Sequence, residues 1–275
     1  MTYPNRAWRI LGYLALAVAA AGLLLPFYWM VVSSLKSDND VFTIPIQWLP
    51  DPVVWSNYLD IWRVSQMTTW LKNTLIISVA VTVSQLLTGS FAAYGFAKVR
   101  FPGRDVLFLV YIGTIAVPWQ SYMVPQFILM SKLGLSDTRW SIIALQAFGA
   151  LGVFLMKQFY DSIPDELVDA ARIDGMSEFG IYRRIMLPLS VPALASLTLL
   201  TLVTTWNDYL GPLIYLRSPG LRTIQLGLST FISQYNAEYA LIMTGSVLSV
   251  LPIAVIFLLG QRYFVEGIST TGLKG

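Results

Sequence analysis

The 275-residue chain contains neither cysteine nor histidine. Disulfide bonds, thiolate chemistry, metal ligation by histidine and proton relays through histidine are therefore excluded. The sequence also lacks a GxxxxGKS or GxxxxGKT phosphate-binding loop, so we expect the chain to bind no ATP by a loop of that type. We predict no catalytic residue and no metal site. Any energy drawn from ATP must come through another chain.

Charged residues are scarce, at 12% of the chain against 56% apolar residues, whereas about a quarter of a typical soluble domain is charged. Six stretches carry no charge at all, and most are long enough for a helix that crosses a ~30 Å hydrocarbon core. The runs are continuous rather than alternating, which excludes barrel strands. We predict an all-α membrane protein with one domain over residues 1–275. Its six transmembrane helices are expected near residues 10–35, 73–97, 106–131, 140–159, 186–216 and 239–262.

The first apolar run continues to Leu35, well beyond the 7–15-residue core of a cleavable signal, so we expect a retained helix. Lys and Arg are denser in the loops on the side of the N-terminus than in the longer loops opposite. The positive-inside rule then places both termini and residues 162–188 in the cytoplasm. The net charge of +3 follows from this topology, and we predict no nucleic-acid partner.

A polar segment over residues 162–188 separates the fourth and fifth predicted helices. Ser162 followed by Asp165 resembles the start of a capping box and predicts a helix beginning there. Gly175 is expected to end that helix with a positive φ, and Ser177 is expected to cap a second short helix. The segment is therefore predicted to be a helix–turn–helix rather than a plain connection.

Leu167, Ala170, Ala171 and Asp174 recur at helical spacing within this segment. Small side chains on such a face let a partner approach closely. Two interpretations remain open on the residues alone. The face docks another protein, or the helix lies on the lipid surface as an amphipathic element.

Asp208 is the one acid embedded in a predicted transmembrane helix, and it lies beside Trp206 and Asn207. A carboxylate inside the membrane is costly and is by default a functional candidate. Helix packing and lining of a cavity both turn the acid away from lipid. We therefore treat Trp206, Asn207 and Asp208 as pore or packing candidates.

The order Asp169-Ala170-Ala171, three residues, Gly175, nine residues, then Ile185-Met186-Leu187-Pro188 resembles the EAA loop of ABC-importer permeases. Asp169 replaces the family's Glu, and Met176 stands where the family usually has Ala. Further segments agree with the same family, and the chain's end is similar to the second permease subunit of maltose-type carbohydrate importers. These segments are residues 101–104, 133–138, 206–210 and 261–275.

The resemblance implies a six-helix type I importer permease in a prokaryotic cell (inner) membrane. Its partners would be a homologous permease, an ATPase dimer that binds the ATP, and an extracytoplasmic binding protein that contacts residues 217–238. The partner permease would carry most substrate contacts. The 162–188 loop would transmit closure of the ATPase to the pore, and Asp169 would meet a basic residue of the ATPase. The expected ATPase-docking residues are Leu167, Asp169, Ala170, Ala171, Asp174, Gly175 and Met176.

The cargo implied by the resemblance is a sugar, namely a di- or oligosaccharide. The same architecture could instead import glycerol phosphate or another solute. An ion-coupled secondary transporter with Asp208 as the coupling carboxylate is the remaining alternative. The absence of a histidine relay and of an inverted repeat weakens it.

Overall fold

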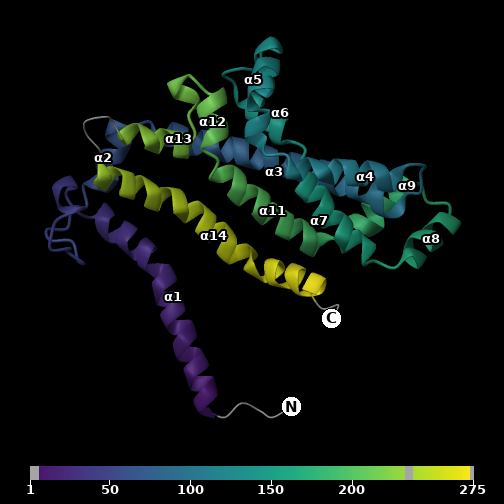
Figure 1. Ribbon diagram of the computed structural model, residues 1–275, viewed down its shortest axis with the longest axis horizontal. Helices are drawn as coiled ribbons and strands as arrows, with labels where there is room; N and C mark the ends of the chain where they lie inside the picture. Colours follow the sequence, from purple (N-terminus) through teal and green to yellow (C-terminus); the bar gives the residue numbers. More distant parts are fainter. Residues whose placement is uncertain (1–5, 233–237, 273–275) are drawn as a thin grey trace. The chain divides into compact units, whose positions relative to one another are not determined.

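The computed structural model describes residues 6–232 and 238–272. The regular elements of this described part are helices and helical turns (Figure 1). They belong to two compact units. Unit 1 comprises Met1–Thr68 with Gly227–Pro252, and unit 2 comprises Thr69–Leu226 with Ile253–Gly275.

Unit 1 is organised around the end of helix α1 (Arg6–Ser34). The Asn57 side chain, at the start of α2 (Asn57–Val64), donates hydrogen bonds to the carbonyl oxygens of Ser34 and Lys36, at 2.9 and 2.8 Å. The hydroxyl of Thr244, in α14 (Tyr239–Gly272), donates to the same Ser34 carbonyl at 3.2 Å. These bonds satisfy carbonyls that a helix end leaves without partners, so α1 is fixed at its C-terminal end.

Unit 2 is built along α3 (Met67–Lys98). Two separate apolar clusters pack against it. One contains Ala93, Tyr94, Met156, Tyr160 and several residues of the 162–188 loop. The other contains Ile77, Val81, Met130, Ile142, Ile143 and Tyr215. The further helices of this unit are α4 (Arg104–Gly113), α5 (Met123–Lys132), α6 (Arg139–Gln146), α7 (Ala150–Asp161), α8 (Asp165–Ile173), α9 (Glu178–Ile181), α10 (Leu187–Leu189), α11 (Val191–Trp206), α12 (Leu210–Tyr215) and the start of α13 (Ile224–Leu228).

The prediction of one continuous helix over 106–131 is wrong. Helix α4 ends at Gly113, two 3-10 turns follow, and α5 begins at Met123. The cause is Pro118, which has no N–H for a helix and disfavours helical backbone in the residue before it. Val117 accordingly has φ −84° and ψ 112°, in the extended region.

The helix expected over 186–216 is also divided. Residues Glu178–Leu189 and Val191–Trp206 meet at an angle of 77°. Pro192 follows this bend, and a proline ring clashes with the carbonyl four residues earlier, here that of Pro188. A second break at 207–209 separates α11 from α12. Asp208 was predicted to lie inside a continuous helix. It lies instead at the break between α11 and α12.

Four helices of the described chain are long and apolar enough to cross a membrane, or five if the bent pair counts as one span. They are Ile10–Ser34, Met67–Lys98, Arg139–Asp161 and Tyr239–Gln261. The predicted all-α membrane class is confirmed, whereas six uninterrupted helices are not observed. Residues 233–237 of the predicted 217–238 loop, and the last three residues of the 261–275 segment, lie outside the described residues.

Candidate functional sites: the 162–188 loop and a polar cavity

Helix α8 carries the centre of the 162–188 loop and packs on the rest of unit 2 by one face. Val168 and Ala171, three residues apart, are buried in the same apolar cluster as Tyr160 of α7 and Met186. The expected capping box does not form. The Ser162 hydroxyl donates instead to the carbonyl of Phe159 at 2.7 Å, and α8 begins after Pro164.

The turn after α8 is a Schellman motif. The N–H of Met176 donates to the Ala171 carbonyl and the N–H of Gly175 donates to the Arg172 carbonyl, both at 3.0 Å. Gly175 has φ +77°, which a residue with a Cβ adopts only with strain. The predicted positive φ is confirmed. The predicted cap is also confirmed, because the Ser177 hydroxyl accepts from the N–H of Gly180 at the start of α9.

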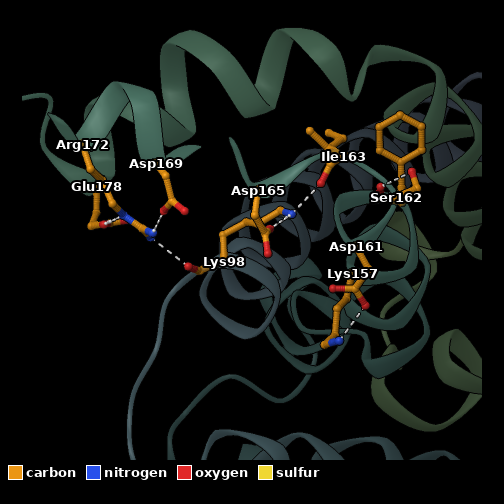
Figure 2. A network of polar contacts seen from close by, with 10 residues as sticks. Lys98, Lys157, Asp161, Ser162, Ile163, Asp165, Asp169, Arg172 and Glu178 are labelled. Atoms are coloured by element: carbon orange, nitrogen blue, oxygen red, sulfur yellow. Dashed lines mark hydrogen bonds and ion pairs between the residues drawn. The ribbon is translucent and has the colours of Figure 1, made fainter. Parts of the chain in front are cut away.

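Lys98, the last residue of α3, anchors the start of the loop (Figure 2). Its ammonium donates to the carbonyl of Ile163 at 2.7 Å and to Oδ1 of Asp165 at 2.5 Å. The Lys98 side chain is 3% exposed, whereas that of Asp165 is 70% exposed. The hydrogen bond and charge of Lys98 hold the pKa of the Asp165 carboxyl below its usual value.

Arg172 joins both helices of the loop to α3 (Figure 2). Its guanidinium donates to Oε1 of Glu178 at 2.8 Å, to Oδ1 of Asp169 at 2.9 Å and to the carbonyl of Lys98 at 2.8 Å. The hydrogen bond with Glu178 is the main cause that raises the pKa of Arg172 above its ordinary value. A planar guanidinium suits such a three-way contact because it presents several donors in fixed directions.

The opposite face of α8 is acidic and apolar and points away from the unit. It consists of Glu166, Leu167, Ala170, Ile173 and Asp174, all exposed; we call this set the outer face of α8. Ile173 is 86% exposed, although a β-branched apolar side chain would normally be covered. Among the described residues, Glu166 and Asp174 form no ion pair.

The structure thus separates the seven residues predicted to dock the ATPase. Leu167, Ala170, Asp174 and Gly175 are exposed, while Ala171 and Met176 face the core of unit 2. Asp169 is 57% exposed and paired with Arg172. The sequence reasoning missed Lys98, Arg172 and Ile173. A lysine that ends an otherwise charge-free stretch was the available signal for the first of these.

A cavity of about 700 Å³ lies elsewhere in unit 2, between α3, α6, α7, α11 and α12. Asn207 and Asp208 are among the residues that line it. Oδ2 of Asp208 accepts from the Gln146 amide at 2.8 Å, and Oδ1 accepts from the N–H of Gly211 at 3.0 Å. Trp206 is only 2% exposed and is not among the lining residues.

Asp137 fixes the segment that follows α12. It has φ +56°, and its Oδ1 accepts from the N–H groups of Arg217 and Ser218 at 2.7 and 2.9 Å. The Ser218 hydroxyl donates to Oδ2. These hydrogen bonds, that of the Ser218 hydroxyl first, hold the pKa of the Asp137 carboxyl below its usual value. Asp137 lies in the 133–138 segment that carried part of the family resemblance.

Within residues 6–232 and 238–272, no group of three acidic side chains comes together in a way that could hold a metal ion. The polar groups described above are instead engaged in hydrogen bonds that shape a loop and a cavity.

The fold defines a multi-pass helical membrane protein with a structured polar loop. A family model described as a binding-protein-dependent transport system inner membrane component matches residues 85–270. The chain belongs to this family. The resemblance based on residues 169–188 is therefore confirmed.

Two relatives match the chain over nearly its whole length. It is 34% identical to the arabinooligosaccharides transport system permease protein AraQ of Halalkalibacterium halodurans, covering 100% of this chain and 99% of that protein. It is 30% identical to the sn-glycerol-3-phosphate transport system permease protein UgpE of Yersinia pestis, covering 98% of each chain.

A solved structure agrees with the fold. The crystal structure of a bacterial ABC transporter involved in the import of the acidic polysaccharide alginate contains a chain that matches with a TM-score of 0.83 and 26% identity. The match covers 96% of this chain and 100% of that chain.

Proposed function

We propose that the chain is one of two pore-forming subunits of an ATP-driven, binding-protein-dependent importer for a di- or oligosaccharide. It works with a homologous permease, an ATPase dimer and an extracytoplasmic binding protein. The chain itself is not an enzyme and holds no cofactor, since ATP is bound by the ATPase subunits. Both termini and the 162–188 loop face the cytoplasm of a prokaryotic cell.

The outer face of α8 is the observation that carries this proposal. Its apolar members, Leu167 and Ile173, are exposed on a loop that is otherwise tightly held by Lys98 and Arg172. A rigid, exposed apolar surface with an acidic rim is suited to a cleft with basic residues in a partner protein. A lipid surface would favour basic rather than acidic residues on the helix, so we favour docking over the lipid-surface alternative.

The acid that meets the ATPase needs an unshielded charge. Asp169 shares its Oδ1 with Arg172, which reduces its net field at the surface. Glu166 and Asp174 flank Ile173 and Leu167 on the outer face. We propose that these two acids take part in docking together with Asp169.

The similarity to a glycerol phosphate permease supports a second candidate, an importer of the same architecture for that anion. Both candidates share the loop, the ATPase and the binding protein. The two candidates differ in the charge of the solute, and the residues that line the pore must suit that charge.

Proteoliposomes that contain the full complex test the proposed function. We expect uptake of the binding protein's ligand only when ATP and the binding protein are both present. Uptake driven by an ion gradient in vesicles that lack the ATPase would refute the importer and support the secondary-transporter alternative.

The docking surface is tested by Asp169→Lys, which should weaken co-purification of the ATPase and abolish uptake. Asp169→Asn removes the charge without reversing it, and within the chain it costs only the exposed pair with Arg172, worth at most about 1 kcal/mol. It should therefore weaken docking and uptake less than Asp169→Lys does. The matched control is Asp105→Lys, because Asp105 is likewise an exposed acid paired with a neighbouring arginine, Arg104, but lies on α4. Equal retention of the ATPase by both Lys variants would remove Asp169 from the docking surface.

A further inference from the structure

One part of the wall of the 700 Å³ cavity is formed by polar side chains connected by hydrogen bonds. The Thr201 hydroxyl donates to Oε1 of Gln85 at 3.2 Å, and the Gln85 amide donates to the carbonyl of Gln146 at 2.8 Å. The side chain of Gln146 then donates to Asp208. Four polar side chains from α3, α6, α11 and the break after α11 are thus held in fixed directions before any solute arrives.

These polar groups can still form further hydrogen bonds with a solute. Each carboxylate oxygen can accept more than one hydrogen bond, and each oxygen of Asp208 accepts one from a described residue. Trp119, Tyr122 and Tyr209 also line the cavity and supply flat apolar faces. A few oriented polar groups among aromatic side chains, in a volume between 300 and 1,000 Å³, are typical of a small-molecule site.

The charge of the wall is informative about the solute. Of the lining residues, all of which lie in the described chain, Asp208 alone is charged and it is negative. These described lining residues include no arginine or lysine, the side chains that normally bind a carboxylate or a phosphate. A negatively charged solute would be repelled by the carboxylate of Asp208.

We propose that this chain contacts the transported solute directly through the Asp208 network, and that the network selects an uncharged sugar over an anionic one. The inference rests on the proposed function. It departs from the expectation that the partner permease carries most substrate contacts. Hydroxyl groups donate to Asp208, while the rings of Trp119 and Tyr209 cover the apolar faces of the sugar.

The first test measures ATP-dependent uptake by the wild-type complex in proteoliposomes with its binding protein. The probes are arabinotriose, lactose, digalacturonate and sn-glycerol 3-phosphate, each first titrated onto the isolated binding protein. We expect transport of an uncharged sugar. Efficient transport of digalacturonate or glycerol phosphate would overturn the inference and leave ATP-driven import intact. Failure to transport any probe would refute sugar import, and the inference with it.

The second test is Asp208→Asn, which keeps an oxygen to accept from Gly211 and removes the charge. Loss of a charge-assisted hydrogen bond predicts a roughly ten- to 100-fold lower kcat/KM for uptake of the uncharged sugar. The control is Asp60→Asn, since Asp60 pairs with Arg63 on α2 and is not among the residues that line the cavity. Unchanged uptake in Asp208→Asn would overturn direct contact.

The third test uses a pair of variants at Thr204. It keeps the inference testable if the Asp208→Asn complex fails to assemble. Thr204 is exposed and lines the cavity, and among the described residues its hydroxyl bonds only the carbonyl of Leu200 in its own helix. Thr204→Lys and Thr204→Met introduce side chains of similar size that differ in charge. We expect digalacturonate to compete with sugar uptake at least tenfold more strongly in the Lys variant. Equal competition in both variants would overturn the selection by charge.

Discussion

Replacement of Lys98 by methionine tests how the 162–188 loop is held. Met keeps most of the aliphatic length of the lysine and removes the ammonium group. The change leaves the carbonyl of Ile163 without the donor it has at 2.7 Å and Asp165 without its ion pair. We expect the start of α8 to open more often while the membrane helices stay folded.

The magnitude follows from the two bonds. A hydrogen bond from a charged donor to a buried carbonyl is worth about 1.5–3 kcal/mol, and Ile163 is buried. The Asp165 pair adds less than about 1 kcal/mol, because the carboxylate is exposed and solvent screens it. A local loss of about 2–3 kcal/mol corresponds to opening that is on the order of 30- to 150-fold more frequent.

Hydrogen exchange measures this opening directly. The amides of Asp174 and Met176 donate to carbonyls of Ala170 and Ala171 at the end of α8, so they report on the helix. They should exchange on the order of 30- to 150-fold faster in Lys98→Met at pH 7. Uptake should fall in parallel, because a loop that opens presents the outer face of α8 only part of the time.

Lys157→Met is the matched control. Lys157 lies near the end of α7, just before the loop, and pairs with an acid, Asp161, at 2.7 Å. Among the described hydrogen bonds it donates to no carbonyl of residues 162–188. In Lys157→Met, hydrogen exchange at the amides of Asp174 and Met176 should stay within about threefold of the wild-type rate, because an isolated ion pair contributes little. Wild-type exchange in Lys98→Met as well would show that the Lys98 ammonium does not hold the loop, and that the packing of Val168 and Ala171 with the contacts of Arg172 is sufficient.

Two further predictions concern positions with positive φ. Gly175→Val should abolish uptake while the protein still inserts, because φ +77° strains a β-branched residue by about 1–2 kcal/mol; Gly175→Asn, which tolerates this region better, should keep more activity, and equal uptake in both variants would contradict the argument. Asp137→Ala should speed exchange at the amides of Arg217 and Ser218, whereas Asp137→Asn should preserve part of the protection. The lowered pKa of Asp137 adds a pH dependence: its stabilisation is complete above the ordinary value of 3.8 and is lost as the pH falls through the lower folded value. Protection of the Ser218 amide that shows no such acid loss in wild type would count against this assignment.

Only some features of the 162–188 loop could be predicted from local sequence patterns. Gly175 and Ser177 were predicted correctly because a helix stop and a helix cap depend on a few neighbouring residues. The roles of Ala171 and Met176 were not, since helical spacing places residues on a face without telling which face is covered. That depends on Tyr160, Met186 and the end of α3, which the chain brings together only on folding.

The sequence by itself determined the membrane class, the family and the helix–glycine–helix loop, because long charge-free runs and the spacing of residues 169–188 are local features. It overestimated the continuity of the third and fifth predicted helices, where Pro118 and Pro192 break the backbone. Only the tertiary structure placed Lys98 and Arg172 as anchors and joined Gln85, Gln146, Thr201 and Asp208 in one cavity wall. These residues are up to 123 positions apart, from Gln85 to Asp208, and their contacts depend on helix packing that no local pattern encodes.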